Sequence, residues 1–297
     1  MTVRNFMPLV WFNNTVTAVD AAAASGSGVS LADYQTLTAA GLLTGEGFFE
    51  TVAVYRGKPF ALAQHLRRLN VSLQRFTMRP VAAELVDRAV AALLQAVPQP
   101  VPAVLRLRLT VWRSGTNSEL LSALLLPGTG PELGQVNPTF ATVVTAAGRR
   151  NEHSILTGHK STSYAENSYT LRAAQTAGAS EAVFYNTAGE LAEGTCSNLL
   201  LERNGELVTP ALSTGCLPGI TRGLVLRWAA TAGLPIREAA PGELTLSVLS
   251  SGDFSAALLG TLRNVQHITS WDQRPLPRGT LLTAVAELFA AQMHTAL

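Results

Sequence analysis

The sequence predicts a mixed protein, between the α/β and α+β classes, in two domains. Strand-like and helix-like segments follow one another without the regular strand–helix–strand repeat of a parallel sheet. A run rich in Pro and Gly at 127–138 interrupts this pattern, which then starts again. The length of 297 residues also suits two domains of ordinary size. We therefore expect an N-terminal α/β domain over 1–126, a linker over 127–138 and a C-terminal domain over 139–297.

The first half of the chain alternates short apolar runs with two helical patterns. Leu66, Leu69, Leu73 and Phe76 recur at intervals of three and four residues, which is the spacing of one helix face. Small residues concentrated at 21–28 indicate a loop, part of a long stretch at 19–43. The expected elements are strands at 8–12, 48–55, 60–63 and 104–112 and helices at 65–76 and 82–97.

The second half continues in the same manner. Gly178 and Gly233 stand where helices are expected to end, because glycine readily adopts the left-handed conformation that terminates a helix. The expected elements are strands at 140–146, 181–186 and 196–202 and helices at 164–176 and 220–232.

Composition and charge exclude several classes of protein. Hydrophobic residues make up 47% of the chain and charged residues 14%, which excludes a disordered protein. A net charge of +2 leaves no electrostatic footprint for nucleic acid. The two cysteines form neither a disulfide framework nor a zinc pattern, and no apolar run approaches about 20 residues. We expect a cytoplasmic protein without a nucleic-acid, membrane or metal partner.

Lysine is scarce in this sequence. Of 22 basic residues, only Lys58 and Lys160 are lysine. An amine can lose its proton and attack a carbonyl, which the permanently charged guanidinium of arginine cannot do. Lys58 lies in the sequence Y-R-G-K-P, which is typical of a turn, so Lys160 is the stronger candidate for covalent chemistry.

Three further segments carry groups that bind charge, each with a structural alternative. Gly219, followed by Ile220 and Thr221, opens an expected helix, whose free N–H groups suit a phosphate, although an ordinary helix start has the same pattern. Thr261 follows an apolar run and offers a similar hydroxyl. Glu193 leads into an apolar strand and needs a buried partner, either a protonated heterocyclic nitrogen or an arginine.

Taken in order, these segments resemble the class IV aminotransferases, the fold-type IV enzymes that use pyridoxal 5′-phosphate (PLP). The resemblance runs from about Thr44 to Ile268. The motifs that carry it are G-E-G-F-F-E-T-V at 45–52, H-L-R-R-L at 65–69, H-K-S-T-S-Y-A-E-N at 159–167, E-G-T-C-S-N at 193–198, L-P-G-I-T-R at 217–222 and G-T-L-R-N-V at 260–265.

The resemblance implies a two-domain fold, smaller at its N-terminus, and a role for each matching residue. Lys160 would bind PLP covalently as an aldimine and move protons, and Glu193 would hold the proton on the pyridine nitrogen. Tyr164 would bond the phenolic oxygen of the ring, and Ser197 and Asn198 would flank the cofactor. The phosphate would be bound by Arg68, Gly219, Ile220, Thr221 and Thr261.

Members of this family catalyse several reactions on small amino substrates. Three residues separate Lys160 from Tyr164, whereas branched-chain aminotransferases typically have four residues between the corresponding lysine and tyrosine. The segment T-L-R-N-V at 261–265 is similar to that of many 4-amino-4-deoxychorismate lyase sequences. Arg113 could hold a substrate carboxylate, but the histidine that accompanies it in D-amino-acid aminotransferases is missing. The sequence thus favours the lyase, which releases pyruvate and 4-aminobenzoate. The alternatives are a D-amino-acid, branched-chain or R-amine transaminase of the same family, and a PLP-binding protein without turnover. The resemblance also implies a homodimer.

Overall fold

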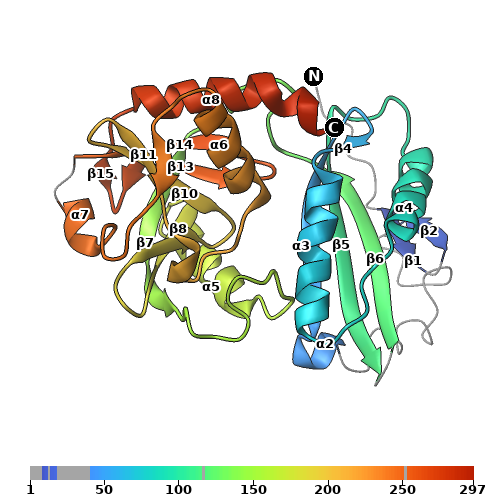
Figure 1. Cartoon of the computed structure of the whole chain (residues 1–297). Coiled ribbons are helices and arrows are strands. Elements are labelled where there is room, and N and C mark those ends of the chain that lie inside the picture. Colours follow the sequence, from blue (N-terminus) through green and yellow to red (C-terminus); the bar gives the residue numbers. More distant parts are fainter. Residues whose placement is uncertain (1–8, 13, 19–40, 116–117, 251–252) are drawn as a thin grey trace. The chain divides into compact units, whose positions relative to one another are not determined.

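The computed structural model describes residues 9–12, 14–18, 41–115, 118–250 and 253–297. The loop expected at 21–28 lies outside these residues, as does most of the stretch 19–43. The chain forms two compact units (Figure 1). The first comprises Met1–Glu132, His159–Tyr164 and Ala296–Leu297, and the second comprises Leu133–Gly158 and Ala165–Thr295. The segment that carries Lys160 therefore belongs to the first unit although both of its flanks belong to the second.

The first unit is built on an antiparallel sheet with strand order β2-β1-β6-β5-β3-β4. Its longest ladder joins β3 to β5, from Gly47 opposite Trp112 to Tyr55 opposite Val104. The strands are β1 (Leu9–Phe12), β2 (Thr15–Ala18), β3 (Gly47–Tyr55), β4 (Lys58–Pro59), β5 (Val104–Gly115) and β6 (Ser118–Pro127), and the short helix α2 (Gly41–Thr44) precedes β3.

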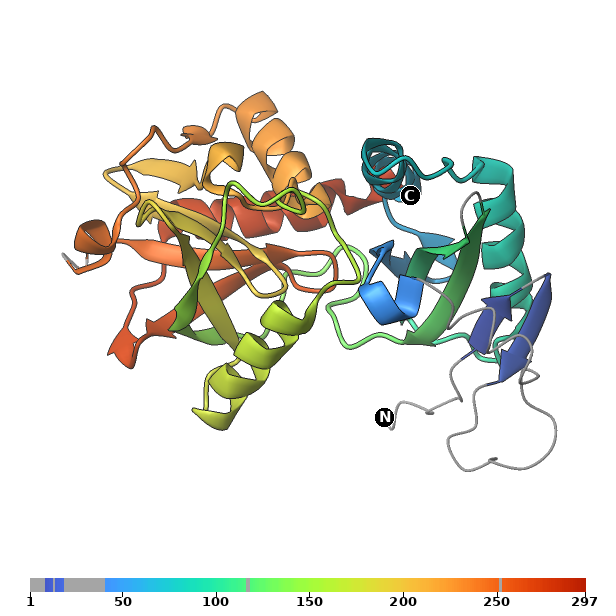
Figure 2. The same ribbon diagram turned by 90° about the horizontal axis from the view of Figure 1, so that it is seen from below.

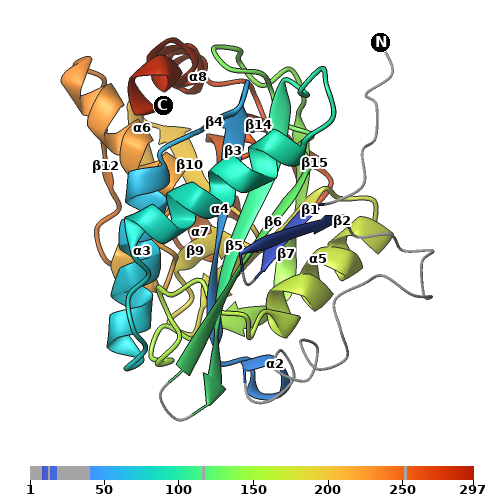
Figure 3. The same ribbon diagram turned by 90° about the vertical axis from the view of Figure 1, so that its right-hand side faces the viewer.

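The two faces of this sheet differ in character, because side chains alternate along each strand. Val52 and Leu107 stand opposite each other on one face and are fully buried there. Two helices cover this face, α3 (Leu62–Arg75) against β3 and α4 (Ala83–Ala96) against β1 and β6 (Figure 3). Phe49 and Arg108 lie on the other face, because Phe49 is three residues from Val52 and Arg108 directly follows Leu107.

The second unit contains a larger, mixed sheet with the path β12-β11-β10-β13-β14-β7-β8-β9, and β15 pairs with β14. Helix α5 packs against β7 and β8, whereas α6 and α8 pack against each other and against β13 and β14 (Figure 2). The strands are β7 (Ala141–Arg150), β8 (Glu181–Asn186), β9 (Leu191–Gly194), β10 (Asn198–Arg203), β11 (Glu206–Thr209), β12 (Ile236–Glu238), β13 (Ser255–Gly260), β14 (Asn264–Trp271) and β15 (Arg274–Pro275). The helices are α5 (Ala165–Thr176), α6 (Ile220–Thr231), α7 (Leu246–Ser250) and α8 (Thr280–Gln292).

Several elements differ from the sequence-based expectation, and β6, β13 and β14 are among those that it did not include. The predicted strand at 60–63 is wrong: β4 ends at Pro59, and Ala61 adopts a left-handed conformation (φ 52°) that reverses the chain into α3. Helix α8 was not predicted, because apolar residues lie all around it and its periodicity is weak. No helix in the described part of the chain has the length and apolar character that a membrane span requires.

Candidate active site

Lys160 is positioned by backbone hydrogen bonds to the start of β3. The N–H of Phe49 donates to the carbonyl of Lys160 at 2.9 Å, and the N–H of Thr162 donates to the carbonyl of Gly47 at 2.8 Å. Glycine is required at position 47, because a Cβ there would lie 2.7 Å from the Trp112 ring and 2.9 Å from the Thr162 hydroxyl. The lysine segment can therefore lie directly against β3.

The Lys160 side chain lies among aromatic rings. Its Nζ is 4.5 Å from the centroid of the Phe49 ring and 5.5 Å from that of Tyr164, and these two rings meet edge to face at 5.3 Å. His159 makes its contacts with a different set of residues: its Nδ1 is 2.9 Å from the Ser72 hydroxyl of α3. The neighbouring residues His159 and Lys160 therefore contact different sets of residues, as expected in an extended segment whose successive side chains point in opposite directions.

Arg68 is held by a buried carboxylate. Its Nε donates to Glu50 Oε1 at 2.8 Å and its Nη2 to Glu50 Oε2 at 2.6 Å, along one edge of the guanidinium. The preceding residue, Arg67, is exposed to solvent. Burial alone raises the pKa of the Glu50 carboxyl, but the charge of Arg68 and the hydrogen bonds from His65 and Arg68 outweigh it and hold that pKa at about 2. Glu50 is therefore ionised at neutral pH and fixes the orientation of Arg68.

His65 completes this cluster from the same helix. Its Nδ1 lies 2.7 Å from Glu50 Oε2, and its side chain is fully buried. Burial lowers the pKa of the His65 imidazole below its usual value of 6.5, although the hydrogen bond and charge of Glu50 act in the other direction. A neutral imidazole facing a carboxylate carries its proton on the facing nitrogen, so Nδ1–H donates to Glu50.

Arg113, the residue with an expected role at a substrate carboxylate, already has partners. Its Nη2 donates to the carbonyl of Phe76 at 2.8 Å, and its Nε lies 3.1 Å from Glu46 Oε2. The positive charge of this side chain is therefore partly neutralised within the first unit.

In the second unit, Glu193 on β9 has a defined orientation. Its Oε2 accepts a hydrogen bond from the N–H of Leu217 at 2.8 Å, and its Oε1 lies 3.2 Å from Nε of Arg150. The Arg150 guanidinium in turn lies 4.4 Å from the centroid of the Phe184 ring. The carboxylate is only 12% exposed.

The N-terminus of α6 has the properties expected of an anion site. Gly219 is its N-cap, and no side chain among the described residues caps it. A Cβ at Gly219 would lie 1.9 Å from Asn198 Oδ1, so only glycine fits there. Asn198 also donates from Nδ2 to the carbonyl of Leu217 at 2.8 Å. Ile220 and Thr221 begin the helix, and Thr221 is buried.

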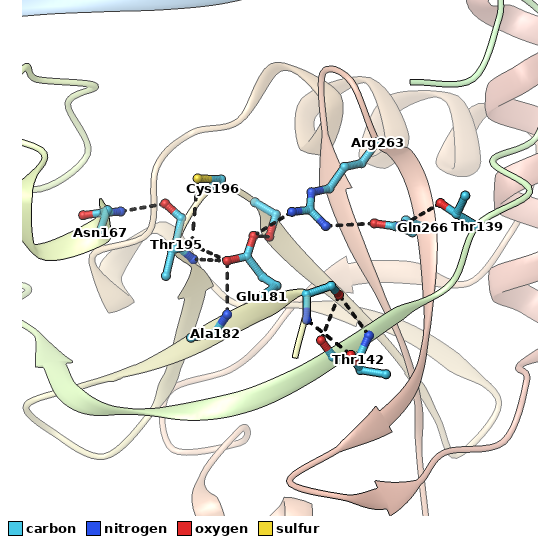
Figure 4. Close-up of polar contacts among 11 residues, drawn as sticks. Thr139, Thr142, Asn167, Glu181, Ala182, Thr195, Cys196, Arg263 and Gln266 are labelled. Carbon is cyan, nitrogen blue, oxygen red and sulfur yellow. Dashed lines mark hydrogen bonds and ion pairs between the residues drawn. The ribbon is translucent and has the colours of Figure 1, made fainter. Parts of the chain in front are cut away.

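Glu181 joins the segments around this site (Figure 4). It is fully buried, and Oε1 accepts from the N–H groups of Ala182 and Thr195, each at 3.1 Å, and from the Thr195 hydroxyl. Its Oε2 accepts from the Ser197 hydroxyl at 3.3 Å and lies 3.3 Å from Nη2 of Arg263. One carboxylate thus binds the turn that follows Glu193 and an arginine of a second turn.

That second turn, between β13 and β14, contains Thr261. The N–H of Arg263 donates to the carbonyl of Gly260 at 3.0 Å and closes the turn. Nη1 of Arg263 donates to Gln266 Oε1 at 2.9 Å, and Asn137 Nδ2 donates to the carbonyl of Arg263 at 2.7 Å. Thr261 is therefore carried by a turn that side chains hold at several points.

The predicted residues fall into two groups, one in each unit. The first unit carries Arg68, Arg113, Lys160 and Tyr164. The second unit carries Glu193, Ser197, Asn198, Gly219, Ile220, Thr221 and Thr261.

Sequence reasoning missed the polar residues that hold these groups in place. Glu50 stands inside a quoted motif without an assigned role, and Glu181 begins the apolar run E-A-V-F-Y-N. The argument applied to Glu193, that a carboxylate entering an apolar strand needs a partner, would have found Glu181 as well. Of the two cysteines, Cys196 is exposed and Cys216 is buried.

Comparison with known proteins decides the family. The family "Amino-transferase class IV" matches residues 47–271, most of the chain. The chain belongs to the class IV aminotransferases. The resemblance inferred from the motifs is thereby confirmed.

Three relatives of known sequence illustrate the range of the family. A Synechocystis protein named "Probable branched-chain-amino-acid aminotransferase" is 33% identical over 138 residues, which is 44% of this chain and 45% of that protein. A Methanocaldococcus jannaschii protein named "Putative branched-chain-amino-acid aminotransferase" is 29% identical over 79% of this chain and 81% of its own length. The aminodeoxychorismate lyase of Bacillus subtilis is 26% identical over 72% of this chain and 73% of its own length.

Among solved structures, the fold IV-transaminase from Curtobacterium pusillum superposes with a TM-score of 0.76 at 25% identity. The match covers 94% of this chain and 92% of that one. The expected mixed, fold-type IV architecture is therefore confirmed.

The donor set of the class IV aminotransferase fits PLP. The uncapped start of α6, with the glycine that Asn198 requires, suits a phosphate. A nearly buried carboxylate at Glu193 suits a pyridinium N–H, and Lys160 supplies an amine beside aromatic rings. These three features match the phosphate, the ring nitrogen and the aldehyde of the cofactor.

The Glu50 cluster predicts a pH dependence of stability. The folded pKa of about 2 lies below the ordinary value of 4.5, so the ionised carboxylate stabilises the fold above about pH 4.5. This contribution, about 3 kcal/mol, is lost as the pH falls toward 2. Glu50→Gln should be less stable than the wild type at pH 7, and the difference should shrink below pH 4.5. Urea unfolding over a pH series measures it, and a difference that stays constant down to pH 2 contradicts the assignment.

The hydrogen bonds and ion pair of Glu181 predict that a substitution of nearly equal size destabilises the protein. Glu181→Gln places an amide N–H₂ against groups that are all donors, which should lower the free energy of unfolding by about 1–3 kcal/mol. Glu287→Gln, the same change at an exposed position of α8, should stay within about 0.5 kcal/mol of the wild type. Urea unfolding followed by circular dichroism compares the two. Equal stabilities of both variants would show that the buried contacts do not need the charge.

Proposed function

We propose that this protein is an amino-acid aminotransferase. As a class IV aminotransferase it is an enzyme that depends on PLP. The observation that carries the proposal is the placement of Lys160, one of only two lysines, against Phe49 and Tyr164 within the region that matches the family.

The residues of both units are assigned roles toward the cofactor. Bound PLP supplies an electron-withdrawing ring that stabilises the negative charge left when a bond to the substrate's Cα breaks. Lys160 would hold the cofactor aldehyde through Nζ and would move a proton at the substrate's Cα. Glu193 holds the proton on the ring nitrogen.

The remaining assignments concern binding and orientation. Tyr164 donates its hydroxyl to the phenolic oxygen of the ring, and Ser197 and Asn198 flank the ring. The phosphate is bound by Arg68, which Glu50 orients, by the helix start at Gly219, Ile220 and Thr221, and by Thr261. Arg113 remains a weaker candidate for the substrate carboxylate, because Glu46 already pairs with it.

The relatives favour a transaminase over the lyase that the sequence motifs favoured. Two relatives carry the name branched-chain-amino-acid aminotransferase, one of them matching over 79% of this chain. The lyase remains the second candidate because the Bacillus subtilis enzyme matches over 72% of the chain. The homodimer stays a prediction that derives from the family resemblance. The cytoplasmic location also stays a prediction.

A substrate panel tests the reaction. The PLP-loaded enzyme is offered L-leucine, D-alanine and R-1-phenylethylamine, each with 2-oxoglutarate, and aminodeoxychorismate alone. We expect turnover of an amino acid, measured as glutamate formed, and no 4-aminobenzoate. Release of 4-aminobenzoate, without glutamate from any donor, would instead support the lyase.

The role assigned to Lys160 predicts that removing its amine abolishes activity and that removing the amine of Lys58 does not. Lys160→Ala should abolish turnover, because no amine remains to bind the cofactor aldehyde or to move the Cα proton. Lys58→Ala is the matched control, since Lys58 is exposed in the β3–β4 hairpin, and it should keep nearly full activity. Borohydride reduction followed by peptide mapping should place the cofactor on Lys160. Cofactor on Lys58, or full activity of Lys160→Ala, would overturn the assignment.

A further inference from the structure

His159 directly precedes Lys160 in the chain, and its side chain is held against helix α3. Its Nδ1 lies 2.9 Å from Ser72 Oγ. The rings of Phe76 and Phe48 meet the imidazole edge to face, with centroids 5.2 and 6.2 Å from its own. The imidazole therefore has one polar and two aromatic contacts, all with residues of the first unit.

Ser72 connects this imidazole to the part of α3 that carries Arg68. It stands four residues after Arg68, is buried, and donates its hydroxyl proton to the carbonyl of Arg68 at 3.3 Å. Burial lowers the pKa of the His159 imidazole, and the charge of Arg75 lowers it further, so the ring is neutral at neutral pH. A hydroxyl has only one proton, so Ser72 Oγ accepts the bond from Nδ1–H of His159.

A second connection between Lys160 and Arg68 passes through β3. The N–H of Phe49 donates to the carbonyl of Lys160 at 2.9 Å. Glu50, the next residue of β3, binds Arg68 through both carboxylate oxygens. Lys160 and Arg68 are thus joined through β3 on one side and through the contact of His159 with α3 on the other. Two such connections restrain the separation of Lys160 and Arg68 more than either does alone.

The cofactor makes this separation important. The aldehyde and the phosphate of PLP are attached to one rigid ring, and the proposed function assigns the aldehyde to Lys160 and the phosphate to Arg68. A ligand with two linked groups binds more tightly when the sites that receive them are already held at the matching separation. Loss of one connection should therefore weaken the binding of PLP even when both receiving groups are still present.

We propose that His159 is a positioning residue which, through Ser72, keeps Lys160 and Arg68 at the separation that PLP requires. The inference rests on the proposed function, since it deepens the cofactor site. Neither His159 nor Ser72 is assigned a contact with the cofactor. Their loss should therefore affect a ligand that uses both Lys160 and Arg68 more than a ligand that uses only one of them.

Titration of the full-length apoprotein with three ligands tests this role without turnover. Pyridoxal lacks the phosphate, and inorganic phosphate lacks the aldehyde, whereas PLP has both. Ser72→Ala and His159→Leu should each raise the Kd for PLP about two- to tenfold, the usual net worth of one hydrogen bond. The Kd values for pyridoxal and for inorganic phosphate should stay within about twofold of the wild type. Visible absorbance measures the two aldehydes, and calorimetry measures phosphate.

Further variants separate this hydrogen bond from a general structural effect. His159→Asn places a side-chain N–H near the position of Nδ1 and should keep the PLP affinity within about twofold of the wild type. The double variant Ser72→Ala/His159→Leu should bind PLP no more weakly than the weaker of the two single variants, because both changes remove the same bond. The matched control is His153→Leu, a change at an exposed histidine seven residues before Lys160, which should leave all three affinities unchanged.

Three results would overturn the proposal. They are an unchanged Kd for PLP in both single variants, losses that add up in the double variant, and a loss of pyridoxal affinity as large as that of PLP. The last result would mean that His159 acts on Lys160 alone. The titrations need no amino substrate, so a substrate panel without transamination would refute the proposed function and leave the role of His159 to be judged by the affinities.

Discussion

The arrangement of the candidate site segments in the second unit depends on the burial of one carboxylate. Glu181 has no access to solvent, so every donor around it must point inward to satisfy its charge. Those donors are the backbone and hydroxyl of Thr195, the hydroxyl of Ser197 and the guanidinium of Arg263. The segment that carries Glu193 and the turn that carries Thr261 are far apart in sequence, yet both are tied to this carboxylate. The cost of leaving it unsatisfied is what specifies their arrangement.

In the first unit, side chains that alternate along β3 separate the Glu50 ion pair from the surroundings of Lys160. Glu50 and Phe49 are neighbours on β3 and therefore face opposite sides of the sheet. Glu50 meets His65 and Arg68 of α3, whereas Phe49 meets Lys160, Tyr164 and Arg108. A one-residue slip of β3 would exchange the two environments and bury a phenyl ring against His65 and Arg68. The ladder to β5, paired along its length from Gly47 to Tyr55, excludes such a slip.

Local patterns predicted much of this structure, and long-range contacts account for what they missed. The helix over 65–76 was found within a few residues because its apolar face repeats regularly, whereas α8 escaped because it is apolar all round. Lysine scarcity pointed to Lys160, but its pairing with β3 joins residues more than a hundred positions apart, and no local pattern records that. The partners of Arg68 and Arg113 were invisible for the same reason. The sequence shows a charge and its neighbours along the chain, while the fold decides which charge remains without a counter-ion.

The Lys160 segment has a consequence for how this chain can be divided. His159–Tyr164 belongs to the first unit, although residues 133–158 and 165–295 belong to the second. A fragment ending at residue 132 would retain β3 but lose the segment His159–Tyr164 that pairs with its beginning, together with the lysine. A fragment beginning at residue 133 would contain the lysine without Phe49 and Gly47, which fix its position. Neither fragment would contain Lys160 together with the residues that fix its position.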